Sequence, residues 1–387
     1  MIRGMTGRYE TTTVAGEEIH AFLPNPLPPA PSLEMSDQRQ RLLERATLAL
    51  GRLDSITLLL PNAELFLYAY VRREAVLSSQ IEGTQSSLVQ LMLFELHEAP
   101  GVPLDDVVEV SNYVAALNHG LKRLQEGFPL SNRLIREMHA ILLSRGRGSE
   151  RTPGEFRHSQ NWIGGTRPGN AHFVPPPPHS VEKCMSTLEG FLHNQGNPYP
   201  SVIKAALVHF QFETIHPFLD GNGRVGRLLI AFILHCDKVL AQPLLYLSLY
   251  FKQHRSEYYR LLDQVRIHGD WEAWIDFFLE GVEQTASNAV ETAKKLVDLF
   301  EEDAERIQSL GRTASTVLRV FRILRQRPVV TLNEICEQTS LSFPSAAKGM
   351  QALETLEIAQ EITGNRRNRV FSYREHLAIL SEGAEPL

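Results

Sequence analysis

A mainly α-helical fold, with a small β-hairpin and a C-terminal winged helix-turn-helix, is what this sequence predicts. Between about Ser36 and Arg306, apolar residues recur at helical spacing and are separated by short breaks. After Arg312 the pattern changes to short helices that alternate with short apolar strands. The chain has 387 residues, of which 43% are hydrophobic and 22% charged, so we expect a large buried core.

The helical segments can be placed in order along the chain. The first helix is expected from about Ser36, and helical spacing continues from Ala63 to Leu96. Two helices are expected within 105–145, separated at Phe128-Pro129. Further helices are expected at 180–194, at 202–215 and from about Gly223 onward. Helix then dominates to about Arg306, with a solvated acidic break at Glu301-Glu302-Asp303. We expect three domains: an N-terminal helical region (1–104), a central core (105–300) and a C-terminal domain (301–387).

The C-terminal domain is expected to be a winged helix-turn-helix. Helices at 316–325, 332–339 and 344–356 would combine with strands at 329–331, 358–362 and 370–373. Between Arg312 and Arg374 there are ten Lys or Arg and five Asp or Glu, a net charge of about +5. Two interpretations stay open, namely protein contacts or dimer packing, and DNA binding. In the second, phosphates or bases would meet Ser345, Lys348, Arg366, Arg367 and Arg369.

Composition limits the class of protein. The net charge of −6 argues against a protein whose whole surface coats nucleic acid or an anionic membrane. Three scattered cysteines are too few for a disulfide framework, which fits a reducing compartment. No stretch resembles a signal peptide or a membrane-spanning helix. We therefore expect a cytoplasmic protein that does not contact membranes.

One string of twelve residues, from His216 to Arg227, combines the groups needed to handle a nucleotide polyphosphate. It lies between two apolar helical segments and reads His-Pro-Phe-Leu-Asp-Gly-Asn-Gly-Arg-Val-Gly-Arg. His216 can accept a proton near neutral pH. Asp220 can hold Mg²⁺, a hard cation that takes its remaining ligands from water and substrate. Gly221 and Gly223 let a phosphate approach the backbone.

The residues after Asp220 favour an anion. Asn222 tolerates a left-handed turn, and the helix that follows would direct backbone N–H groups and the positive end of its dipole toward a phosphate. Arg224 and Arg227 lie on one helix face and can reach neighbouring phosphates. A dinucleotide fingerprint would need a preceding strand, and a calcium loop would need a terminal acid, and neither is present. His209, His235 and Cys236 lack the spacing of a zinc site.

This string resembles the signature of the Fic family, H-x-F-x-[DE]-G-N-G-R-x-x-R, at every fixed position. The resemblance implies an all-helical core that transfers AMP from ATP to a hydroxyl group of a protein side chain. It implies that His216 is the base for a Ser, Thr or Tyr hydroxyl, that Phe218 packs the loop into the core, and that Asp220 binds Mg²⁺. Gly223 stands where relatives that act as kinases have a lysine, which favours nucleotidyl transfer.

The same resemblance implies a phosphate site. Gly221, Asn222 and Gly223 would form the anion hole for the α- and β-phosphates, while Arg224 would contact the β-phosphate and Arg227 the γ-phosphate. The nucleotide-binding residues expected in the loop are Gly221, Asn222, Gly223, Arg224, Gly226 and Arg227.

A segment far from the loop resembles the inhibitory-helix motif of one class of this family, [ST]-x-x-x-E-[GN]. Ser78 and Glu82-Gly83 match that motif. The resemblance implies that Glu82 lies in the active site opposite Arg227, in a partly buried pair, and blocks productive ATP binding. Two alternatives stay open: the segment is an ordinary helix end capped by Gly83, or Glu82 orients a water molecule for removal of AMP.

Two other segments extend the expected site. Residues 161–178 read as a β-hairpin followed by a polyproline stretch, at the place of the family's flap, and the nucleotide and target peptide would contact Ala171, His172, Phe173 and Val174. Tyr258 and Tyr259 resemble a tyrosine pair that lines adenine and ribose, although aromatic residues at helical spacing can equally be core.

The function expected from the sequence is therefore that of a protein adenylyltransferase, inhibited by Glu82 and forming a homodimer. Its expected partners are Mg-ATP, target proteins with a hydroxyl side chain and, through the winged helix, DNA. Two alternative functions stay open: a hydrolase that removes AMP from proteins, and a DNA-binding regulator whose core only senses a nucleotide.

Overall fold

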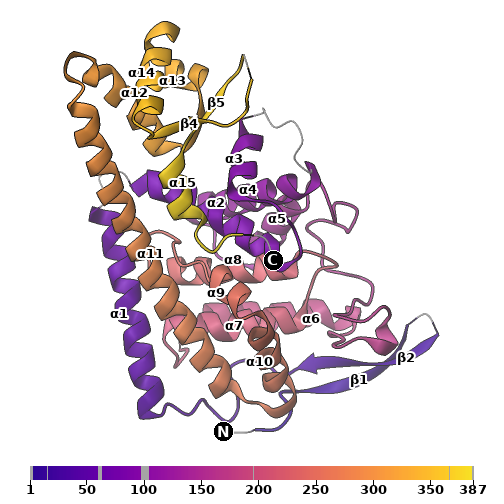
Figure 1. The fold of residues 1–387 in the computed structure, drawn as a ribbon. Coiled ribbons are helices and arrows are strands. Elements are labelled where there is room, and N and C mark those ends of the chain that lie inside the picture. The colour runs from indigo at the N-terminus through magenta and orange to yellow at the C-terminus, as the bar shows by residue number, and fades with distance from the viewer. Residues whose placement is uncertain are drawn as a thin grey trace. The chain divides into compact units, whose positions relative to one another are not determined.

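The structure, a computed structural model, describes residues 3–14, 16–59, 63–96, 104–194, 196–365 and 367–385. It is mainly α-helical, as predicted from the sequence (Figure 1). None of the helices within the described residues has the length and apolar character needed to cross a membrane.

The helices agree closely with the predicted segments. In chain order they are α1 (Asp37–Leu59), α2 (Ala63–Ile81), α3 (Leu88–Glu95), α4 (Leu104–Gln125), α5 (Asn132–Leu142), α6 (Pro178–His193), α7 (Ser201–Ile215), α8 (Asn222–Cys236), α9 (Ser248–Gln253), α10 (Arg255–His268), α11 (Trp271–Gln308), α12 (Ala314–Gln326), α13 (Leu332–Thr339), α14 (Phe343–Thr355) and α15 (Arg374–Ser381). The strands are β1 (Gly7–Val14), β2 (Glu17–Pro24), β3 (Val329–Thr331), β4 (Ala359–Glu361) and β5 (Val370–Tyr373).

Packing divides the chain into two compact units. The first consists of residues 1–51 and 111–286, and the second of residues 52–110 and 287–387. The N-terminal residues thus group with the central helices, whereas α2 and α3 group with the C-terminal helices and strands. The expected domains 1–104, 105–300 and 301–387 divide the chain differently and stay a prediction.

The core of the first unit is built on α7 and α8, which lie side by side (Figure 1). Nearly every residue of α7 and α8 is buried, including the polar side chains His209, Glu213, Arg224 and Arg227. Gly226 allows their close approach, since a Cβ atom there would lie 2.4 Å from Oε1 of Glu213. The indole of Trp274 in α11 donates a hydrogen bond to the carbonyl of Ala206 (3.0 Å) and anchors a third helix to this pair.

The β-hairpin of the first unit is not where the sequence predicted it. Strands β1 and β2 pair antiparallel, with Gly7 opposite Pro24 and Val14 opposite Glu17. The predicted hairpin within 161–178 is reduced to a single antiparallel bridge between Ile163 and Phe173. A 3₁₀ turn at Pro168–Asn170 interrupts the segment, because Pro168 has no N–H to donate to a ladder.

The second unit contains the expected elements of a winged helix-turn-helix. Helices α12, α13 and α14 are accompanied by an antiparallel sheet with the strand order β3-β5-β4. Lys348 on α14 is exposed, whereas Arg369 is paired with Glu354 (3.2 Å). Arg366 lies outside the described residues.

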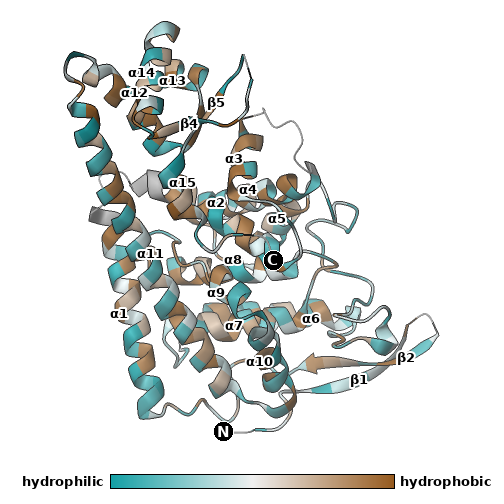
Figure 2. Ribbon diagram, in the orientation of Figure 1, coloured by the Kyte–Doolittle hydropathy of each residue, from teal (hydrophilic) through white to brown (hydrophobic). Residues whose placement is uncertain are grey.

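The predicted acidic break at residues 301–303 is wrong. Helix α11 continues without interruption to Gln308, and its buried residues follow helical spacing from Ala286 to Phe300. Hydrophobic and hydrophilic residues both occur along α11 (Figure 2). Asp303 is buried, and its carboxylate accepts a hydrogen bond from the Tyr373 hydroxyl (2.6 Å) and pairs with Arg306. A carboxylate with two such partners is stable inside a helix, and a charge pattern alone does not reveal those partners.

Helix α2 is joined to the end of the chain inside the second unit. The Gln80 amide is buried and donates one hydrogen bond to the carbonyl of Ser86 and another to that of Ala384, both 3.0 Å long. Arg73 donates to the carbonyl of Glu382 (2.6 Å). The C-terminal residues therefore hold both α2 and the turn that follows it.

We expect Gln80→Met to reduce the local stability of residues 79–86 by about 2 kcal/mol, because two buried carbonyl groups lose their donor. Hydrogen exchange of the amides in this segment measures the change. Gln85→Met, at an exposed position five residues away, is the control and should leave exchange nearly as in the parent. Equal protection in both variants would show that the Gln80 amide does not hold this turn.

Candidate active site

The loop predicted to bind a polyphosphate begins directly after Ile215, the last residue of α7. His216 is the C-cap and has a left-handed backbone conformation (φ 49°, ψ 61°). Its N–H still donates to the carbonyl of Phe212 (2.9 Å), so the helix ends by turning sharply at this histidine. A non-glycine residue in this region carries strain on the order of 1 kcal/mol, which the surrounding structure must offset.

Phe218 anchors the loop in the core, as the resemblance implied. Its ring is fully buried and stacks on the imidazole of His139, with 3.7 Å between ring centroids and 6° between ring planes. Its backbone is held by amide side chains: Asn222 accepts from the Phe218 N–H and donates to its carbonyl (both 2.8 Å), and Asn161 donates to the same carbonyl (2.9 Å). Asn222 therefore holds the loop closed through its side chain.

Helix α8 begins directly after Gly221, which has a positive φ of 76°. The first-turn N–H groups of α8, at residues 222–224, have no acceptor within the helix and form the positive end of its dipole. Asp220 stands next to them, with 34% of its side chain exposed, and its Oδ1 accepts from the Gly221 N–H (2.5 Å) and from Arg224 (3.2 Å). This arrangement suits an anion and a cation bound side by side.

The two arginines of the string are both buried on α8. Arg224 is fully buried and pairs with Asp220, and Arg227 is 5% exposed. Gly223 is half-buried in the first turn. Gly226 was predicted to contact nucleotide, but its position is explained by the packing of α8 on α7 and by its carbonyl, which pairs with His209 (2.9 Å). Its nucleotide contact stays a prediction.

The expected flap is docked on the N-terminal hairpin. The Phe22 N–H of β2 donates to the Val174 carbonyl (2.9 Å), and the Phe173 ring packs between Phe22 and the guanidinium of Arg266. Phe173 and Val174 are buried, so they fix the flap in place. Of the four predicted contact residues, Ala171 is half-buried and His172 is exposed and pairs with Asp263 (2.5 Å).

The tyrosine pair is divided between core and surface. Tyr258 is 2% exposed, and its hydroxyl pairs with Nε2 of His209 (2.9 Å). Tyr259 is 39% exposed and packs edge-on against Tyr258. Tyr259 has the accessibility that a nucleotide contact requires, and both assignments stay predictions.

Ser78 and Glu82 lie in the second compact unit. Ser78 is buried in the last turns of α2, and Glu82 is exposed in the turn after Ile81, where Gly83 has a φ of 100°. The helix thus ends at the predicted motif with a glycine turn, and the exposed Glu82 differs from the partial burial expected for it. The inhibitory role of both residues stays a prediction.

Three residues that hold the loop were not identified from the sequence: His139, Arg157 and Asn161. His139 links Asp220 to the preceding segment, because its Nε2 pairs with the Asp220 carbonyl (3.0 Å) and its Nδ1 accepts from the Gly154 N–H (2.8 Å). Burial lowers the pKa of His139 to about 4, so the ring is neutral and can both donate and accept. No motif surrounds these residues, so local sequence gave no signal of their role.

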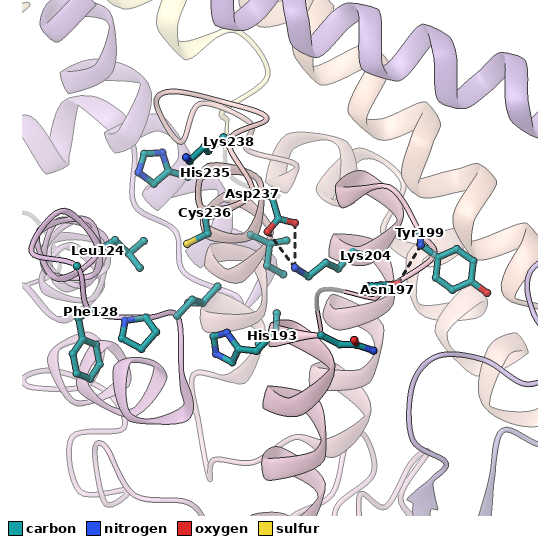
Figure 3. A pocket seen from close by; sticks show the side chains of 16 residues that line it. Leu124, Phe128, His193, Asn197, Tyr199, Lys204, His235, Cys236, Asp237 and Lys238 are labelled. Atoms are coloured by element: carbon teal, nitrogen blue, oxygen red, sulfur yellow. Dashed lines mark hydrogen bonds and ion pairs between the residues drawn. The ribbon is translucent and has the colours of Figure 1, made fainter.

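The first unit also contains a cavity of about 750 Å³ at the opposite ends of α7 and α8 (Figure 3). In its wall Lys204 and Asp237 form an ion pair, with both carboxylate oxygens 3.1 Å from the ammonium group. Asp237 thus neutralises Lys204, and neither His216 nor Asp220 lines this cavity. The loop is the better candidate.

A metal ion at this site would depend on few protein ligands. Within the described residues no three His, Cys, Asp or Glu side chains gather as a metal site. A single, partly exposed carboxylate beside a phosphate site nevertheless suits Mg²⁺, which keeps several waters and takes further ligands from substrate phosphates. Asp220 has this position, so the residues present fit Mg²⁺.

Comparison with known protein families gives two matches. Residues 40–122 match the model described as Fic/DOC family N-terminal, and residues 129–234 match the model of the Fic/DOC family. The second match includes His139, Arg157, Asn161 and the whole string from His216 to Arg227.

Similar proteins of known name include "Protein adenylyltransferase Fic" of Aedes aegypti, 33% identical over 214 residues, and that of Drosophila grimshawi, 30% identical over 208 residues. The alignments cover 53% of this chain and 39% and 40% of those relatives, so the chain matches about two fifths of their length.

Solved structures share the fold. A Fic family protein from Desulfovibrio desulfuricans G20 has a TM-score of 0.57 and 19% identity, over 88% of this chain and 97% of that one. Fic-1 (residues 134–508) from C. elegans has a TM-score of 0.53 and 22% identity, over 66% of this chain and 73% of that one.

Because of His209, we expect the free energy of unfolding to fall as the pH is lowered. Burial lowers its pKa to about 3, against about 6.5 when unfolded, so below pH 6.5 the unfolded chain binds a proton that the folded chain does not. The free energy of unfolding lost through His209 grows from pH 6.5 toward pH 3 and should reach about 2 kcal/mol at pH 5. Urea unfolding between pH 5 and 8 measures it.

His209→Gln should reduce this pH dependence by the share of His209 and not abolish it, because the buried rings of His139 and His376, with pKa values lowered to about 4 and about 3, still titrate. Tyr258→Phe is the control: it removes the hydroxyl partner of His209 and should lower stability without flattening the slope. The same slope in His209→Gln as in the parent would assign the acid sensitivity to other groups.

Proposed function

We propose that this chain, which matches the Fic/DOC family models over residues 40–122 and 129–234, is a protein adenylyltransferase, which transfers AMP from Mg-ATP to a hydroxyl group of a target protein. The main support is the loop, where the C-cap His216 of α7 and the N-terminus of α8, whose N-cap is Gly221, lie within one anchored turn. The relatives that carry the name protein adenylyltransferase support the same reaction. The absence of a lysine at Gly223 favours transfer of the nucleotidyl group.

In the proposed reaction His216 removes the proton from a Ser, Thr or Tyr hydroxyl. The hydroxyl oxygen then forms a bond to the α-phosphorus of ATP, the bond from that phosphorus to the bridging oxygen breaks, and pyrophosphate leaves. The N–H groups at the start of α8 stabilise charge on the phosphate oxygens, and Arg224 and Arg227 hold the β- and γ-phosphates. Positioning and charge stabilisation supply most of the rate enhancement in such transfers.

Asp220 would hold Mg²⁺ through its carboxylate. The ion, when bound, would neutralise part of the phosphate charge. Because Oδ1 of Asp220 accepts from the Gly221 N–H, the carboxylate is already oriented beside the start of α8. Asp220 thus has a positioning partner in its own loop.

The finer parts of the proposal concern regulation and partners. Glu82 would inhibit transfer by competing with the γ-phosphate for Arg227, and Ser78, one turn earlier on α2, would support the motif. The winged helix-turn-helix would bind DNA through exposed cations such as Lys348, the protein would form a homodimer, and its compartment would be the cytoplasm. Removal of AMP by the same site is the alternative reaction.

Incubation with ATP labelled at the α-phosphate, with ATP labelled at the γ-phosphate as the comparison, tests the reaction. Label transferred to protein from the first but not the second indicates AMP transfer. The reverse result would indicate a kinase, and transfer from neither would favour a nucleotide sensor. Release of AMP from protein modified beforehand would show the hydrolase alternative.

We expect His216→Ala to reduce transfer roughly 10²–10⁴-fold, the usual cost of losing a general base. Nucleotide binding should change little, because the anion site consists of α8 N–H groups and arginines. His193→Ala, an exposed histidine at the end of α6, is the control and should transfer AMP at the parent rate. Unchanged transfer in His216→Ala would remove this histidine from its proposed role.

We expect Glu82→Gly to raise modification of the protein itself and of targets by roughly an order of magnitude or more, because Arg227 becomes available to the γ-phosphate. Adding Arg227→Ala should reverse the gain. Glu126→Gly is a matched control, since Glu126-Gly127 ends α4 in the same kind of turn, with Gly127 at φ 83°.

If Glu82→Gly and Glu126→Gly are equally active while His216 proves essential, then the segment at Ser78 to Gly83 is only a helix end.

A further inference from the structure

Arg157 is a deeply buried charged side chain that contacts the loop from outside it. It is 1% exposed and lies in the irregular segment between α5 and α6. Its guanidinium donates only to backbone carbonyl groups: Nε to His216 (2.9 Å), Nη2 to Pro176 (2.6 Å) and Ile215 (3.4 Å), and Nη1 to Ser159 (3.4 Å). Its own N–H donates to the Pro217 carbonyl (2.9 Å).

Among the described residues the hydrogen bonds of the Arg157 guanidinium go to carbonyl groups and not to a carboxylate, yet burying a charge without an opposite charge is costly. Two of its acceptors, the carbonyls of Ile215 and His216, belong to the end of α7, where the helix dipole is negative. Burial lowers the pKa of Arg157 to about 10, so the group stays charged at neutral pH. The end of α7 and the flap therefore provide the acceptors that stabilise this cation.

The contact to His216 acts on a strained residue. The left-handed conformation of His216 sets the direction of its carbonyl group. This carbonyl accepts from Arg157 Nε at 2.9 Å and from Asn161 Nδ2 at 3.4 Å. Turning His216 back to an ordinary conformation would move this carbonyl and break the bond to Arg157. The direction in which the imidazole leaves the backbone is thus coupled to Arg157.

The second contact reaches the flap. Pro176 follows Val174 by two residues, and its carbonyl accepts the shortest of the Arg157 bonds. Because a guanidinium is planar and rigid, the separation of its Nε and Nη2 acceptors is fixed. One side chain therefore sets the distance between the backbone of His216 and the base of the flap.

We propose that Arg157 is a positioning residue for AMP transfer, which holds His216 at a fixed place relative to the flap that presents the target hydroxyl. The inference rests on the proposed function of His216 and of the flap. Arg157 itself touches no reacting atom. It acts by keeping the His216 imidazole and the target hydroxyl aligned, and a small error in this alignment lowers the transfer rate strongly.

The first test is Arg157→Lys, which keeps a positive charge but loses the planar guanidinium and the fixed geometry of its N–H donors. We expect the rate of self-modification at saturating ATP to fall roughly 10- to 100-fold, with KM for ATP within about threefold of the parent. Arg136→Lys is the matched control: Arg136 is an exposed arginine that donates to the nearby Gly154 carbonyl (2.7 Å), and its change should leave both constants unaltered. A fall in Arg136→Lys of the same size would overturn the assignment.

The second test uses chemical rescue of Arg157→Ala. Millimolar methylguanidinium should restore part of the rate. Methylammonium has the same charge but not the planar set of N–H donors, so it should not restore the rate. Equal rescue by both ions would mean that only the charge of Arg157 matters, and it would overturn the proposal. Rescue by neither ion, in an Arg157→Ala variant with the melting temperature of the parent, would also overturn it.

The third test does not depend on activity. Histidine labelled with ¹³C at Cε1 gives one NMR signal per ring, and His216→Ala assigns the signal of His216. We expect this signal to shift in Arg157→Lys and to stay in place in Arg136→Lys. An unmoved signal would overturn the positioning role even if no AMP transfer occurs, whereas a shifted signal without transfer would contradict only the proposed function.

Discussion

The pairing of loop carbonyls with buried side-chain donors is the constraint on which the site depends. Between Ile215 and Asp220 the chain leaves one helix and approaches another, so the carbonyl groups at the end of α7 lack the helical donors that would follow them. Arg157, Asn161, His139 and Asn222 supply the missing donors. Each donor is buried or half-buried, and losing one would leave a buried carbonyl unsatisfied.

Burial also explains the charge states around the loop. A neutral His139 can donate to Asp220 and accept from Gly154 at the same time, which a doubly protonated ring cannot do. Arg157 stays charged, because the carbonyl groups at the end of α7 and in the flap stabilise it. The same unit thus uses one neutral and one charged residue to hold a single turn, each suited to its acceptors.

Aromatic packing connects the loop to the remainder of the first unit. Phe218 stacks on His139, and Phe173 in the flap packs between Phe22 and Arg266. These contacts link the hairpin β1–β2, the flap and α10, which are far apart in the sequence. Rigid support of this kind is what a site needs when its reaction depends on alignment more than on reactive side chains.

The sequence by itself determined most helices, the loop and the match to the Fic family signature, because these features are local. Apolar spacing defines α7 and α8, and the string from His216 to Arg227 carries its chemistry in consecutive residues. Only the tertiary structure decided which residues support the loop. Asp303 in α11 is paired with Tyr373, which is 70 residues away, and the carbonyl of the left-handed His216 is paired with Arg157, which is 59 residues away. Such partners become neighbours only when the chain folds, so no local pattern marks them.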